Sequence, residues 1–117
     1  MFARIVGCAF NSYNYWHEGF DELCYEAGLF IELETAGFIP HRHVKRRVDL
    51  VVSDKCLGDV ILELKAINFV GDEQRKQLWS YMKLTGMRYG MLINFGPKGG
   101  GSENWMLDEL SGKCKRV

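Results

Sequence analysis

Two carboxylates and a lysine interrupt the most apolar part of this sequence. Asp49 lies within the aliphatic run 48–52, and Glu63 and Lys65 end a second such run, 60–65. Side chains alternate between the two faces of a strand, so Glu63 and Lys65 should point the same way. A charge buried without a partner loses its hydration, so such groups pair or bind an ion. Two carboxylates that meet could hold a divalent cation, with an ammonium group beside it.

The two aliphatic runs predict a pair of strands. Residues 53–59 between them carry the turn formers Ser, Asp and Gly, which favours a β-hairpin. Apart from the three charged residues, both faces of both strands are apolar, as in a sheet that is covered on each side. A structural alternative stays open, because Lys65 could simply pair with Glu63 or Asp49 in a satisfied polar pocket.

Three helices are predicted around these strands. Residues 2–15 carry apolar side chains at helical spacing, and residues 20–36 form a second apolar periodic segment. Residues 72–85 form the third helix, with Asp72 as its N-cap and Gly86 at its end.

The second helix is expected to be buried on two sides. Tyr25, Leu29 and Leu33 form an apolar stripe opposite another stripe, so the helix should lie between the sheet and the first helix. Glu22 lies one turn before Tyr25 and is therefore expected near or within packed structure. A carboxylate in the first turn also suits the helix dipole, which is the simpler explanation of Glu22. Glu26 is more easily explained as solvated.

One polar residue interrupts the apolar face of the third helix. Gln77 shares that face with Leu78 and Tyr81. If the face covers the sheet, the amide of Gln77 must find a hydrogen-bond partner.

The remaining segments complete an α/β pattern. Residues 38–44 are expected to be extended, with Pro40 favouring either an edge position or a strand that begins after it, and residues 89–95 form a buried strand. The tail offers a further edge strand at 105–107 or 113–117. The expected order is helix, helix, three strands, helix, strand, which gives a central mixed sheet flanked by helices.

The composition indicates one globular domain covering residues 1–117. Hydrophobic residues make up 47% and aromatic residues 13%, while 15 basic and 15 acidic residues balance. Binding to a phosphate backbone needs only a local basic patch, and one is present at 41–47. A solvated strand edge explains that patch equally well. The candidate nucleic-acid-binding residues are Arg42, His43, Lys45, Arg46 and Arg47.

The cysteines and the apolar runs exclude several other classes. The four cysteines, Cys8, Cys24, Cys56 and Cys114, are far apart and form no CxxC pair, which argues against a zinc or iron–sulfur centre. No apolar run has the length of a membrane span, and the first residues do not resemble a signal peptide. A cytoplasmic protein with free thiols is expected.

Several strings resemble one known family. Asp49, thirteen intervening residues and then Glu63-Leu64-Lys65 resemble the signature of the PD-(D/E)xK nuclease superfamily. Residues 19–25 match GxxExxY, the string that names a small family within it. The similarity continues through a Q-L-x-x-Y helix at 77–81 and a T-G-x-x-x-G-x-L-I-N-F-G segment at 85–96. Among the departures, Tyr13 stands where the family is expected to have histidine.

This resemblance implies a restriction-endonuclease-like sandwich and metal-dependent hydrolysis of phosphodiester bonds. Asp49, Glu63 and the backbone carbonyl of Leu64 would bind Mg²⁺ or Mn²⁺, with Glu22 as a further ligand. Lys65 would orient or deprotonate the attacking water and stabilise the charge that develops on phosphate. Gln77 would steady Lys65, the substrate or a water molecule.

Two functions compete with a DNA nuclease. A non-catalytic module could bind nucleic acid or protein with the same sheet and basic residues. A hydrolase could act on phosphates that are not nucleic acids. No membrane partner is expected, and a homodimer is compatible with the small size of the domain.

Overall fold

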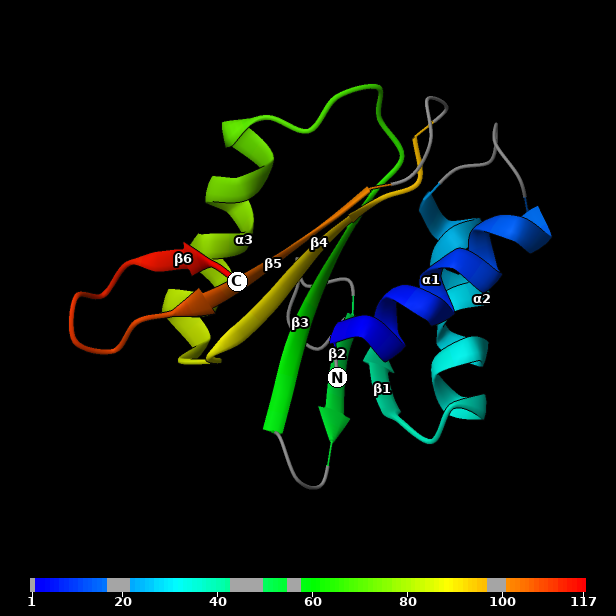
Figure 1. The fold of residues 1–117 in the computed structure, drawn as a ribbon, viewed down its shortest axis with the longest axis horizontal. Coiled ribbons are helices and arrows are strands. Elements are labelled where there is room, and N and C mark those ends of the chain that lie inside the picture. The colour runs from blue at the N-terminus through cyan, green and yellow to red at the C-terminus, as the bar shows by residue number, and fades with distance from the viewer. Residues whose placement is uncertain (1, 17–21, 43–49, 55–57, 97–100) are drawn as a thin grey trace.

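The computed structural model describes residues 2–16, 22–42, 50–54, 58–96 and 101–117 (Figure 1). Within these ranges the chain forms three helices and six strands in the order ααβββαβββ. The elements are α1 (Phe2–Trp16), α2 (Glu22–Thr35), β1 (Ile39–Arg42), β2 (Leu50–Asp54), β3 (Gly58–Lys65), α3 (Asp72–Thr85), β4 (Tyr89–Asn94), β5 (Gly101–Leu107) and β6 (Cys114–Arg116).

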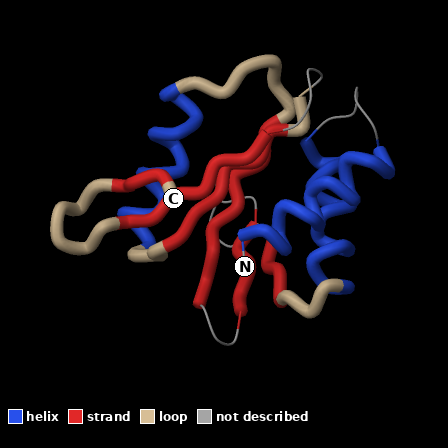
Figure 2. Tube along the Cα trace, viewed as in Figure 1, coloured by secondary structure: helices blue, strands red, loops and turns tan. Residues whose placement is uncertain are grey.

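All six strands belong to one sheet, in the order β1-β2-β3-β4-β5-β6 (Figure 2). The predicted hairpin is confirmed, because β2 and β3 are antiparallel and Leu50 pairs with Leu62. Only β3 and β4 are parallel among these neighbours, and α3 provides the crossover that a parallel pair requires. The sequence predicted one further edge strand in the C-terminal segment, at either 105–107 or 113–117. Both form, as β5 and β6, because each pairs with its neighbour.

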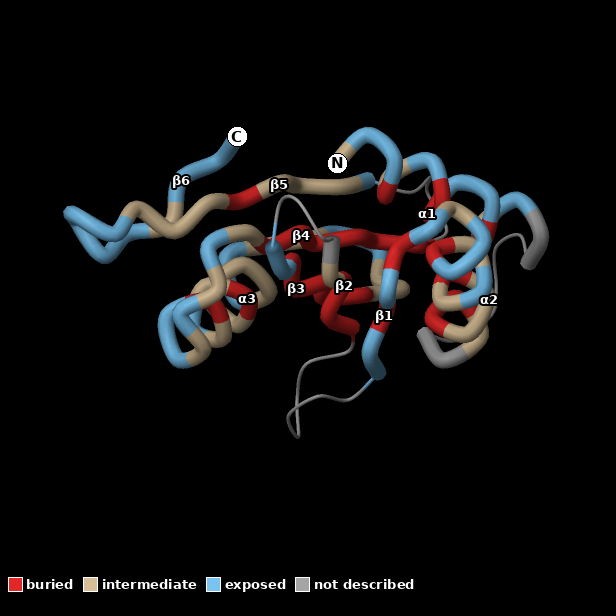
Figure 3. Tube along the Cα trace, turned by 90° about the horizontal axis from the view of Figure 1, so that it is seen from below, coloured by how far each residue is buried: buried red, intermediate tan, exposed pale blue. Residues whose placement is uncertain are grey.

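The helices cover the two faces of the sheet. Residues of α1 and α2 pack on one face, where the core includes Leu62 and Leu64 of β3. On the other face, Ile61 of β3 packs against Leu78 and Met82 of α3. The central strands are therefore buried from both sides (Figure 3). The predicted α/β sandwich with a mixed central sheet is confirmed.

The start of α3 differs from the prediction. The N-cap is Gly71, and Asp72 is the first helical residue, where its charge still suits the helix dipole. The side chain of Gln74, the third helical residue, accepts a hydrogen bond from the backbone N–H of Gly71 at 2.8 Å. This hydrogen bond replaces the cap that was expected from the side chain of Asp72. Gly86 ends the helix as predicted, in a left-handed conformation with φ of 71°.

Glu26 was expected in solvent, and this is wrong. Only 3% of the residue is exposed, and its Oε1 lies 3.2 Å from Nε of Arg42. The reason is tertiary, since β1 packs beside α2 and brings Arg42 to this carboxylate. Of the two alternatives for Pro40, the edge position is confirmed, because β1 is the first of the described strands in the sheet and begins at Ile39, before the proline.

Candidate active site

Glu63 and Lys65 lie on the α3 face at the end of β3. They follow Ile61 at alternate positions, and Ile61 packs against α3. The predicted shared face is therefore confirmed. The Nζ atom of Lys65 lies 3.3 Å from Oε1 of Glu63, and only 2% of Glu63 is exposed. A carboxylate taken so far out of water must be compensated, and the ammonium group of Lys65 contributes to that compensation.

Gln77 of α3 reaches the same ammonium group. Its Oε1 accepts a hydrogen bond from Nζ of Lys65 at 3.1 Å, while its Nε2 donates to the hydroxyl of Tyr81 at 3.4 Å. Gln77 and Tyr81 are one helical turn apart, so α3 presents both on the side that faces the sheet. The expected need of Gln77 for a partner is confirmed. The side chain of Lys65 is 19% exposed, so this group remains accessible to solvent.

The segment that follows Lys65 is fixed by the end of β4. Asn94 accepts a hydrogen bond from the backbone N–H of Ile67 at 3.0 Å and donates one to the carbonyl of Ile67 at 2.9 Å. A Cβ atom on Gly96 would lie 1.8 Å from the same carbonyl oxygen, so only glycine fits there. Asn94 and Gly96, both part of the family-like string, thus fix the backbone that follows Lys65.

Two other family-like positions meet across the core. The ring of Tyr25 in α2 stacks on that of Phe95, with centroids 4.6 Å apart and planes 2° apart. The backbone N–H of Phe95 donates to the carbonyl of Lys65 at 2.7 Å. The first turn of α2 therefore lies at the end of the sheet where β3 finishes. Glu22 is the first residue of α2, one turn before Tyr25, and its side chain lies outside the described residues.

Two of the other predicted site residues are described, and their side chains lie away from this group. Leu64 directs its side chain into the core on the α1 and α2 face. Arg42 ends β1 and pairs with Glu26, so its guanidinium group is already partly engaged. The remaining candidates lie outside the described residues: Asp49, His43, Lys45, Arg46 and Arg47.

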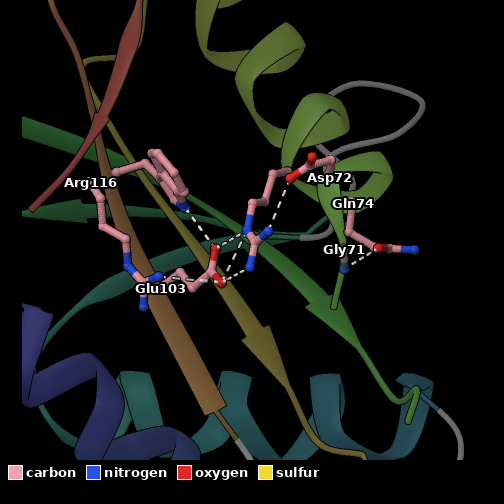
Figure 4. Close-up of polar contacts among 7 residues, drawn as sticks. Gly71, Asp72, Gln74, Glu103 and Arg116 are labelled. Atoms are coloured by element: carbon pink, nitrogen blue, oxygen red, sulfur yellow. Dashed lines mark hydrogen bonds and ion pairs between the residues drawn. The ribbon is translucent and has the colours of Figure 1, made fainter. Parts of the chain in front are cut away.

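A second charged cluster beneath α3 was not anticipated (Figure 4). Arg75 donates from Nε and Nη2 to Glu103 of β5 at 2.8 and 2.7 Å, and from Nη1 to Asp72 at 3.1 Å. Glu103 also accepts from the indole N–H of Trp105 at 3.2 Å and lies 3.7 Å from Nη1 of Arg116. No periodic signal pairs residues 28 positions apart, so sequence reasoning missed this cluster.

The cluster shifts the ionisation of both main partners. The hydrogen bonds from Arg75 hold the pKa of Glu103 below its ordinary value, although partial burial opposes this. The same contacts, with that of Asp72, raise the pKa of Arg75. Glu103 is therefore an anion at neutral pH, and Arg75 is its permanent counter-ion.

Among the described residues at the end of β3, the carboxylate of Glu63 offers oxygen donors to a metal ion. Within the described ranges, no three side chains of His, Cys, Asp or Glu gather closely enough to hold a metal ion. Glu63 is the one predicted carboxylate ligand whose side chain is described. Nor does any helix in those ranges have the length and apolar character needed to cross a membrane.

Comparison with known proteins agrees with this arrangement. Residues 1–104 match the family model described as the PD-(D/E)XK nuclease superfamily. The chain belongs to this superfamily. Its fold also resembles that of Hjc, a Holliday junction resolvase from Archaeoglobus fulgidus, with a TM-score of 0.51 over 82% of each chain. The two sequences are 17% identical, so this structural likeness shows a shared restriction-endonuclease-like fold alone. Among curated proteins, no sequence matches this chain.

Proposed function

We propose that this superfamily member is a metal-dependent nuclease that hydrolyses phosphodiester bonds, with DNA as the expected substrate. One observation carries the proposal. The ammonium group of Lys65 is held between the buried carboxylate of Glu63 and the amide of Gln77, at the end of a strand where substrate can reach it.

Asp49 is proposed as the second carboxylate of the site. Leu50 pairs with Leu62 and points to the α1 and α2 face. Continuing that register by one residue would set Asp49 opposite Glu63, and alternation would turn both toward the α3 face. The proposal therefore needs only that β2 begins one residue earlier.

The proposed donor set suits a hard divalent cation. Asp49, Glu63, the carbonyl of Leu64 and Glu22 offer oxygen atoms alone, which is the preference of Mg²⁺ and Mn²⁺. When bound, such a cation supplies positive charge beside the phosphate and lowers the pKa of water. The stacking of Tyr25 on Phe95 supports the inclusion of Glu22, because it draws the first turn of α2 to this end of the sheet.

Lys65 and Gln77 have distinct proposed roles. Lys65 would donate to a non-bridging phosphate oxygen and hold the attacking water, so that its charge opposes the charge that develops. Gln77 would keep the ammonium group in place, and Tyr81 would in turn hold the Gln77 amide. Arg42, His43, Lys45, Arg46 and Arg47 would bind the nucleic-acid backbone without reading its sequence.

The finer assignment, to the GxxExxY group, is also proposed. Its supporting evidence is that the residues of its strings contact one another. Tyr25 stacks on Phe95, Gln77 bonds Lys65, and Asn94 fixes the backbone of Ile67. Each of these contacts joins segments far apart in the chain at the end of β3.

The test is a cleavage assay with Asp49→Asn and Lys65→Met. Labelled linear duplex, single strand and four-way junction serve as probes, the last because the structural neighbour is a Holliday junction resolvase. We expect wild-type protein to cut at least one probe with Mg²⁺ or Mn²⁺, and not with a chelator. Both variants should lose cutting while they stay folded and keep the affinity for the probe.

Lys76→Met is the matched control, because Lys76 is an exposed lysine on α3 whose loss removes the same charge. It should cut at the wild-type rate. Wild-type protein that binds the probes but never cuts them would identify a binding module instead. Turnover of small phosphoesters without cutting of DNA would identify the third function. Full cutting by Lys65→Met would place the chemistry elsewhere in the chain.

A further inference from the structure

A pocket of about 390 Å³ lies between α1 and the strands β4 and β5. It is on the face opposite Lys65, and none of the roles proposed above uses it. Its size lies within the range of small-ligand sites in proteins, which starts near roughly 300 Å³. The residues that define its chemistry are Phe10, Tyr13, Asn14, Ile93, Phe95 and Ser102.

The walls of this pocket suit a flat, aromatic ligand. Phe10 is 57% exposed, although a phenylalanine on a helix beside a sheet would ordinarily be buried. Tyr13 stacks on Tyr25, with centroids 6.1 Å apart and planes 19° apart, and Tyr25 stacks on Phe95. The pocket is thus bordered by a stack of aromatic rings on one side and by the exposed ring of Phe10 at its rim.

Polar groups at the same pocket could bind the edge of such a ring. Asn14 offers an amide, which both donates and accepts, and Ser102 offers a hydroxyl. Neither side chain makes a hydrogen bond to another described residue. A purely aliphatic ligand would leave these groups desolvated and unsatisfied, which costs free energy. A heteroaromatic ring with donors and acceptors on its edge would satisfy them.

The position of the pocket connects it to the candidate active site. Ile93 pairs with Leu64, and Asn94 pairs with Lys65, across the parallel β3–β4 ladder. Neighbouring strands lie about 4.8 Å apart, so the pocket reaches within one strand of the backbone of Lys65. The side chains of Lys65 and Phe95 point to opposite faces. A polymer that contacts both Lys65 and the pocket would therefore pass over the end of the sheet.

We propose that this pocket receives one unstacked base of the nucleic-acid strand whose phosphate is cut at Lys65. The inference rests on the proposed nuclease function and adds a substrate class: a strand with an unpaired base near the cut. The base would stack on Phe10 or Tyr13 and bond Asn14 or Ser102 with its edge. Stacking of a base on an aromatic side chain contributes about 1–3 kcal/mol and tolerates any base.

The test measures binding without cleavage. A short single-stranded DNA that carries 2-aminopurine at one position is titrated with wild-type protein in a chelator. We expect the fluorescence to be quenched as the base stacks, with the strongest quenching at one position. Phe10→Ala should weaken binding about 5- to 100-fold and remove the quenching. Phe10→Trp should retain both, whereas Phe10→Leu, which keeps apolar volume without an aromatic face, should not.

Ile31→Ala is the matched control, because Ile31 is a similarly exposed apolar residue, 62% exposed, on α2. It does not line the pocket, so its variant should bind as wild type does. Equal affinity and quenching in Phe10→Ala and wild type would overturn the inference. So would tight binding of 2-aminopurine riboside monophosphate alone, because that result would indicate a site for free nucleotides.

The two proposals can fail separately. Cleavage with Mg²⁺ that is unaffected by Phe10→Ala, at any substrate concentration, would refute the base pocket and leave the nuclease intact. Quenching that depends on Phe10 in a protein that never cuts DNA would refute the nuclease and leave a base-binding pocket.

Discussion

Two acid–base contacts lie beneath α3, and they are built differently. Arg75 donates two hydrogen bonds to Glu103, at 2.7 and 2.8 Å, and Glu103 also accepts one from an indole N–H. Lys65 approaches Glu63 with one ammonium group at 3.3 Å and shares that group with Gln77 at 3.1 Å. The carboxylate of the looser pair is nonetheless the more buried one, since 3% of the Glu63 side chain is exposed against 13% for Glu103.

This difference separates a structural contact from a candidate catalytic one. A guanidinium fork that matches a carboxylate is rigid, and it fixes α3 against β5. An ammonium group is a point charge on a flexible stem, so it can turn from Glu63 to an incoming phosphate without breaking a two-donor geometry. The Arg75 pair holds the helix in place, and the Lys65 contact is left adjustable.

The largest expected effect comes from removing the adjustable charge. Lys65→Met should lower the cleavage rate by about 10²–10³-fold, the cost of losing one donor to a developing oxyanion. The melting temperature should fall modestly, because the buried Glu63 carboxylate loses part of its compensation, while methionine retains most of the apolar stem. Single-turnover kinetics and thermal unfolding measure the two effects. A large loss of stability with unchanged kinetics would reverse the roles assigned to the two contacts.

Gln77→Leu should have a smaller effect on the same reaction. Loss of a group that positions a catalytic side chain typically costs about 10–100-fold in activity. Gln77→Glu keeps an acceptor beside Lys65 and should restore part of the rate. A purely structural Gln77 would show no such difference in rate between the leucine and glutamate variants.

The smallest effect on cleavage is expected at the rigid contact. Glu103→Gln should destabilise the fold by about 1.5–3 kcal/mol, because hydrogen bonds to a charged group are lost. Activity per folded molecule should stay near that of wild type. Urea unfolding and initial rates at low temperature separate the two. A loss of activity larger than that of Gln77→Leu would show that the Arg75 cluster takes part in the chemistry.

The same variant should change the acid sensitivity of the fold. The pKa of Glu103 is lower in the folded state than its ordinary value of 4.5, because Arg75 donates to it. The contribution of the ionised Glu103 carboxylate to the stability of the fold is therefore fully present above pH 4.5, its ordinary pKa, and is lost as pH falls through the folded-state pKa. Stability measured from pH 6 downward should fall less steeply in Glu103→Gln than in wild type.

Local patterns were enough to predict the main elements. Alternation along 60–65 placed Glu63 and Lys65 on one face, and helical spacing gave all three helices within a few residues of their ends. Gln77 was singled out because a polar residue on a buried stripe needs a partner, and Lys65 is that partner. These predictions depend on neighbours in the sequence, which explains their success.

Contacts between distant segments could not be predicted in the same way. Glu26 looked solvated until β1 brought Arg42 beside it, and the pairing of Arg75 with Glu103 depends on where β5 enters the sheet. The cap of α3 was misplaced because the side chain of Gln74 replaced the one expected from Asp72. The meeting of Asp49 with Glu63 stays a prediction, since Asp49 lies outside the described residues.

The outermost strands of the sheet limit how this protein can associate. Pro40 in β1 has no N–H to offer a neighbouring chain, and β6 is a three-residue strand that carries Lys115 and Arg116. Both margins are therefore poor templates for strand addition, which protects a highly β-branched, aliphatic sheet from aggregation. If two copies pair on DNA, they should join through side chains on helices or loops rather than through one continuous sheet.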